Sequence, residues 1–112
     1  MTYTAPKVSD KELTPEFVRD QLLLCFESAN REFATVLNQH VTDEQLRAQV
    51  KGFVESVFSS CGVSFDDPSK QGILTAMAEC RANAEKMMGP SGASIIQHHY
   101  DEMLKLANRL PE

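Results

Sequence analysis

The sequence is short of the residues that build turns, and it lacks the segments that enter membranes. It has no tryptophan, and only five glycines and five prolines among 112 residues. So few turn-forming residues argue against a fold rich in strands and turns. No apolar run approaches the roughly 18 residues that a membrane span requires. The first residues, MTYTAPKVSDKE, also lack the basic-then-apolar pattern of a signal peptide. We therefore expect a cytoplasmic protein with no membrane partner.

An excess of positive charge is also missing. The chain carries 11 Lys and Arg residues against 16 Asp and Glu residues, which gives a net charge of -5 at pH 7. The basic residues are scattered along the sequence, whereas proteins that bind nucleic acids usually concentrate them on one face. The charge pattern thus argues against a nucleic-acid partner, and a nucleic-acid-associated regulator is the last of three functional hypotheses.

Signatures of catalysis are absent from the sequence. It contains no Cys-x-x-Cys, no G-x-S-x-G, no Walker A loop and no dinucleotide-binding fingerprint. The carboxylates lie on polar helix faces, and no nucleophile stands beside a base. The sequence therefore predicts no enzymatic activity and no cofactor.

What the sequence does have is a set of apolar stripes with helical spacing. Good helix punctuation flanks them, including Thr14 before Pro15, a Thr42–Gln45 capping box, a stop at Gly62, and Gly89-Pro90 followed by Ser91 as a new cap. These signals predict an all-α four-helix bundle, running up-down-up-down, with helices at 14–39, 42–61, 68–88 and 92–110. A less regular orthogonal array is the alternative. The length predicts one helical domain, residues 13–112, preceded by a flexible tail at 1–12.

Two adjacent histidines lie in the stretch IIQHHYDEM. Neighbouring residues on a helix point about 100° apart, so His98 and His99 do not face one target. His99 falls inside the apolar stripe, between Ile96 and Met103, whereas His98 points elsewhere. We expect His99 to be buried and His98 to be solvated.

His99 also supports an alternative function, a bundle that binds a metal or small ligand. A histidine ligand needs partners from other positions, and the sequence does not force any to converge on it. The ligands therefore stay unknown, and the metal candidates are His99, Cys25, Cys80 and Glu102.

The leading hypothesis is a small helical interaction module or accessory subunit. Such a protein would form a homodimer or bind a helix of a protein partner. The first helix is apolar on more than one side, and the third carries adaptable methionines. An interface is therefore predicted at Phe17, Leu23, Leu24, Met77, Arg81 and Met88. The competing explanation for the first helix is that Tyr3 or Val8 of the tail folds back and covers it.

Overall fold

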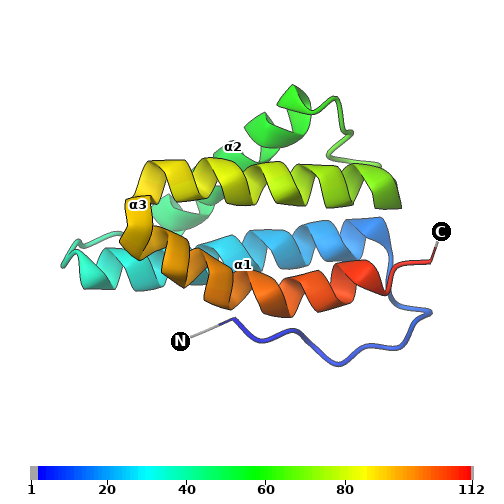
Figure 1. Ribbon diagram of the computed structural model, residues 1–112, viewed down its shortest axis with the longest axis horizontal. Coiled ribbons are helices and arrows are strands. Elements are labelled where there is room, and N and C mark those ends of the chain that lie inside the picture. Colours follow the sequence, from blue (N-terminus) through cyan, green and yellow to red (C-terminus); the bar gives the residue numbers. More distant parts are fainter. Residues whose placement is uncertain (1–2, 112) are drawn as a thin grey trace.

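The computed structural model describes residues 3–111, which form three α-helices joined by loops (Figure 1). Helix α1 spans Pro15–Val36, α2 spans Asp43–Ser60 and α3 spans Lys70–Asn108. No strand occurs within these residues, so the all-α prediction is confirmed. Helix α1 makes most of its contacts with α3, and α2 packs less extensively against both. Among the helices described, none is long and apolar enough to cross a membrane.

The ends of α1 and α2 follow the predicted punctuation. The Thr14 hydroxyl accepts the Phe17 N–H at 3.1 Å, and Thr42 and Gln45 cap each other's backbone N–H, both at 3.1 Å. Both helices end in a Schellman motif, in which a residue of positive φ turns the chain: Asn38 (φ 56°) after α1 and Gly62 (φ 71°) after α2. Helix α1 therefore ends at Val36, before the predicted boundary at 39.

The four-helix prediction is wrong. The segments predicted as separate helices at 68–88 and 92–110 form the single element α3, which is bent at Gly89 (φ 73°, ψ -171°). One non-helical residue reverses the chain without a loop, because helical geometry resumes at Pro90, where the missing N–H has no partner to lose. Figure 1 shows α3 doubling back at this point. We call residues 70–88 its first arm and residues 90–108 its second arm. The fold is a three-helix bundle with a bent third helix.

The bend brings the two arms into close contact. A Cβ atom added at Gly92 would lie only 2.0 Å from the Met88 Cβ, so glycine is required there. Helix α3 begins at Lys70 rather than 68, because the Ser69 hydroxyl caps it by accepting the Gly72 N–H at 3.0 Å. The core beneath the arms consists of large, fully buried side chains from all three helices, including Leu22, Phe26, Phe58, Ile73, Met77, Ile96 and Met103.

Residues 3–12 do not form the flexible tail that the sequence predicted. Residues 3–9 run as an extended segment alongside the second arm of α3 (Figure 1), and residues 10–12 form a turn before Leu13. Tyr3 and Leu13 are only 7% and 3% exposed. The Arg109 guanidinium donates to the Val8 carbonyl at 3.0 Å and to Asp10 at 2.8 Å. We call residues 3–13 the N-terminal strap. Positions 1 and 2 of the predicted tail lie outside the described residues.

Candidate functional site

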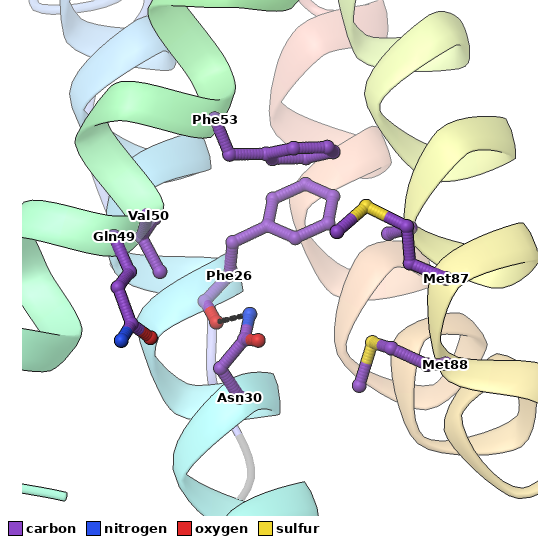
Figure 2. A pocket seen from close by; sticks show the side chains of 8 residues that line it. Phe26, Asn30, Gln49, Val50, Phe53, Met87 and Met88 are labelled. Carbon is purple, nitrogen blue, oxygen red and sulfur yellow. Dashed lines mark hydrogen bonds between the residues drawn. The ribbon is translucent and has the colours of Figure 1, made fainter.

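An apolar pocket of about 260 Å³ lies between α1, α2 and the first arm of α3 (Figure 2). We call it the groove pocket. Phe26 of α1 and Phe53 of α2 meet in it, with ring centroids 6.0 Å apart and planes tilted by 56°. The full lining comprises Phe26, Asn30, Gln49, Val50, Phe53, Ala84, Met87 and Met88. None of these side chains titrates, so the pocket offers an apolar binding surface and no acid–base chemistry.

The helices place these side chains by simple periodicity. Val50 and Phe53 are three residues apart on α2, and Phe26 and Asn30 are four apart on α1, so each pair shares one helix face. The Asn30 amide donates to the Phe26 carbonyl of its own helix at 2.7 Å, as Figure 2 shows. That bond fixes the amide at the edge of the pocket. Apolar surface therefore fills the centre, and the amides of Asn30 and Gln49 are the polar groups in the lining.

Exposed apolar side chains lie at the end of the bundle where α1 stops and α3 bends. Leu37 follows Phe26 by eleven residues, which places it within about 20° of Phe26 around α1. It is 48% exposed, while Val36 is 62% and Met87 is 76% exposed. Figure 1 shows that the C-terminal end of α1 and the bend in α3 lie at one end of the bundle. We call Val36, Leu37 and Met87 the apolar end.

His99 forms a second site, on the opposite face of α1 from α2. It is fully buried, as the sequence predicted, whereas His98 is exposed. Its Nδ1 accepts the Tyr3 backbone N–H at 2.9 Å, and its Nε2 lies 2.6 Å from a carboxylate oxygen of Glu32. Because Nδ1 accepts, the ring proton lies on Nε2 and is donated to Glu32.

Glu32 was missed by the sequence analysis, although a signal for it exists. It follows Ala29 by three residues and Cys25 by seven, both of which are buried, so it stands at the edge of the buried face of α1, with its side chain 38% exposed. A carboxylate in that position needs a donor. The donor is His99, which the sequence analysis placed as a polar residue within the apolar stripe of its helix.

The metal candidates do not converge. No group of three or more His, Cys, Asp or Glu side chains suited to a metal ion occurs within residues 3–111. Both ring nitrogens of His99 are engaged by Tyr3 and Glu32, so His99 is not a metal ligand in this structure. Burial raises the pKa of the Cys25 and Cys80 thiols to about 12. Glu102 pairs with Lys105 at 2.6 Å, which holds the pKa of that carboxyl below its ordinary value.

The six residues predicted for a partner interface do not form one surface. Phe17 and Leu23 are half-buried against the core, and Met77 is fully buried. Arg81 pairs with Glu85 at 2.9 Å and lies over the Tyr100 ring, 5.0 Å from its centroid.

Of the other two predicted residues, one is exposed away from the groove pocket and one lines it. Leu24 is 48% exposed on α1, and Met88 lines the groove pocket. The apolar end was missed, because its exposure depends on where α1 stops and α3 bends.

Comparison with known proteins adds no relative. No family model matches the chain, and searches of curated proteins and of solved structures find no match. Because no relative indicates a function, the functional proposal rests on the groove pocket and the apolar end.

Proposed function

We propose that this protein is a small helical interaction module that forms a homodimer through its groove pocket and apolar end. A single observation carries the proposal. A pocket of about 260 Å³ lies between the three helices, and Met87, one of its lining residues, is 76% exposed. Isolated apolar side chains are common on protein surfaces, but an apolar hollow beside several of them is typical of an interaction site.

The size of the pocket favours side chains of a protein over a small molecule. Small-molecule sites usually enclose about 300–1,000 Å³, and the groove pocket measures about 260 Å³. That volume suits one or two apolar side chains inserted as anchors. Met87 and Met88 form part of its wall, and methionine side chains adapt their shape to what they contact.

The arrangement of hollow and protrusion favours a second copy of this chain as the partner. Leu37, the residue that caps α1, is an exposed apolar side chain, and the groove pocket lies farther along the same helix at Phe26, so each copy offers both a pocket and a side chain to fill one. In a two-fold dimer the same patch meets itself, and each subunit supplies what the other lacks. Two pockets would then be filled by one interface.

Two leucines provide a matched test. Leu24 and Leu37 both lie on or at the end of α1, and both are 48% exposed. We expect Leu37→Glu to weaken the dimer at least tenfold, about 1.4 kcal/mol, because it places a charge against an apolar pocket. Leu24→Glu should leave the dimer constant unchanged. Sedimentation velocity over a concentration series measures both, and circular dichroism checks that each variant keeps its helices.

Three results would contradict the proposal. The unmodified protein could remain monomeric up to about 100 micromolar, well above the range of most specific dimers. Leu24→Glu could dissociate a dimer that Leu37→Glu leaves intact, which would place the interface on the other side of α1. Native mass spectrometry could show a monomer carrying a small apolar molecule, which would make the groove pocket a ligand site.

A further inference from the structure

We propose that the N-terminal strap is a pH-sensitive device, whose Tyr3 end detaches from the bundle when His99 takes up a second proton. His99 is the one polar side chain counted among the fully buried residues of the described chain. It connects segments that are 96 positions apart in the sequence, because its Nδ1 accepts the Tyr3 N–H. The proposal does not depend on the dimer proposed above.

Attachment of the strap and protonation of His99 exclude each other. A neutral imidazole has one nitrogen that accepts and one that donates, and both are used here, by Tyr3 and Glu32 respectively. An imidazolium has two donors and no acceptor. A proton on Nδ1 would therefore point at the Tyr3 N–H, 2.9 Å away, and the two donors would repel each other in a buried place.

Carboxylates contact His99 from α1 and follow it in the sequence of α3. From α1, the Glu32 carboxylate accepts from Nε2 at 2.6 Å and keeps that bond in either state. On α3, Asp101 and Glu102 follow His99 by two and three residues, and Lys105 is paired with Glu102.

The remaining titratable neighbours of His99 are a second histidine and a tyrosine. The His98 ring stands edge-on, 6.2 Å from the His99 ring. On the strap, the Tyr3 phenol donates to Gln21 at 2.6 Å, and burial, followed by the nearby Cys25, raises the pKa of that phenol. No hydrogen bond or ion pair joins His99 to the described residues of α2. Proton uptake at His99 is thus opposed by the burial of the ring and by its bond to the strap.

The direction of the pH effect follows from this linkage. The attached strap requires an unprotonated Nδ1, so attachment is favoured at high pH and weakens as the pH falls. Each pH unit shifts the equilibrium towards the detached strap by up to about tenfold, because one proton is exchanged. Release is local, since Arg109 still holds the Val8 carbonyl and Asp10.

Backbone amide NMR tests the proposal between pH 8 and pH 5. In the unmodified protein we expect the heteronuclear NOE to fall for Tyr3 to Ala5, and the protection factor of the Tyr3 amide to drop at least tenfold, while the three helices keep theirs. His99→Asn places an amide oxygen near the position of Nδ1, which accepts the same N–H but cannot titrate, so its strap should stay ordered throughout. His98→Asn is the matched control on an exposed neighbour, and it should keep the full pH response.

A second variant keeps the test decisive if His99→Asn does not fold. Glu32→Gln retains an oxygen that accepts from Nε2 but removes the negative charge that favours the imidazolium, so strap release should move to lower pH. The proposal is overturned if strap order is the same at pH 8 and pH 5, or if the helices lose protection together with the strap. It is also overturned if His98→Asn abolishes the response, or if Glu32→Gln leaves the midpoint unchanged.

Discussion

Helix α1 packs against other helices on two of its sides, and only one of these two contacts is covered by a further segment of the chain. Towards the second arm of α3, the N-terminal strap covers the contact, so that Tyr3 and His99 are 7% and 0% exposed. Towards α2 and the first arm of α3, nothing in the described chain covers the groove pocket, and Met87 is 76% exposed. We call these the covered side and the open side.

The difference shows what fills the gaps between helices in a small bundle. Helical stripes alone leave gaps where helices cross, on both sides of α1. On the covered side the gap is filled by an irregular segment held by specific polar contacts, Tyr3 to His99 and Arg109 to Val8. On the open side no such segment is present among residues 3–111, and apolar surface remains. A residue should therefore tolerate change according to the side on which it lies.

The covered side should be disrupted most strongly by a charge at its centre. His99→Asp would remove the acceptor arrangement at Tyr3 and place a second carboxylate against Glu32, 2.6 Å from the present ring nitrogen. We expect the free energy of unfolding to fall by about 3–5 kcal/mol, as for other broken buried pairs. His98→Asp, on the exposed face, should change it by less than about 0.5 kcal/mol. Urea titration of both variants measures this, and equal losses would mean that the helix phase is misassigned.

Two methionines test the difference between the two sides through packing alone, without a change in charge. Met103 is fully buried near the strap, whereas Met87 lies on the open side with most of its surface in water. Met103→Ala should cost about 2–5 kcal/mol through lost burial and the cavity left behind. Met87→Ala should cost no more than about 0.5 kcal/mol. Thermal or chemical unfolding of the two variants, at a concentration where both are monomeric, is the measurement, and a large loss from Met87→Ala would show that the open side is closed within the monomer.

The smallest contrast concerns two helical glycines. A Cβ at Gly92 would meet the Met88 Cβ at 2.0 Å, and a Cβ at Gly52, on α2, meets nothing within 4 Å. Gly92→Ala should therefore destabilise the protein by about 1–3 kcal/mol, because the arms of α3 must move apart. Gly52→Ala should stabilise it by about 0.5–1 kcal/mol through helix propensity. Differential scanning calorimetry resolves opposite shifts in Tm; shifts of the same sign would contradict the close contact at the bend.

The helical fold and the division of the histidines were predictable because both depend on local rules. Thr14, Thr42 and Gly62 act through groups within a few residues of themselves, so the sequence is enough to identify them. The burial of His99 follows from its place between Ile96 and Met103 on one face.

The bend, the strap and the groove pocket could not be obtained in this way. A Gly-Pro pair ends one helix and starts another in the same manner whether or not loop residues intervene. The direct junction of the two arms of α3 at Gly89 was therefore not visible in the sequence. The strap has no periodicity, and its place depends on partners about 100 positions away. The groove pocket depends on how α2 lies against α1 and α3, which no local pattern encodes.

The contact between Arg109 and Val8 has a consequence for the order in which the molecule can assemble during synthesis. The ribosome adds residues from the N-terminus, so α1 and α2 can pair on the open side once about sixty residues have emerged. The strap's partners His99 and Arg109 come 96 and 101 positions after the residues they hold. The strap therefore cannot be placed until residues about 100 positions later have been made. Until then the covered side lacks the segment that closes it.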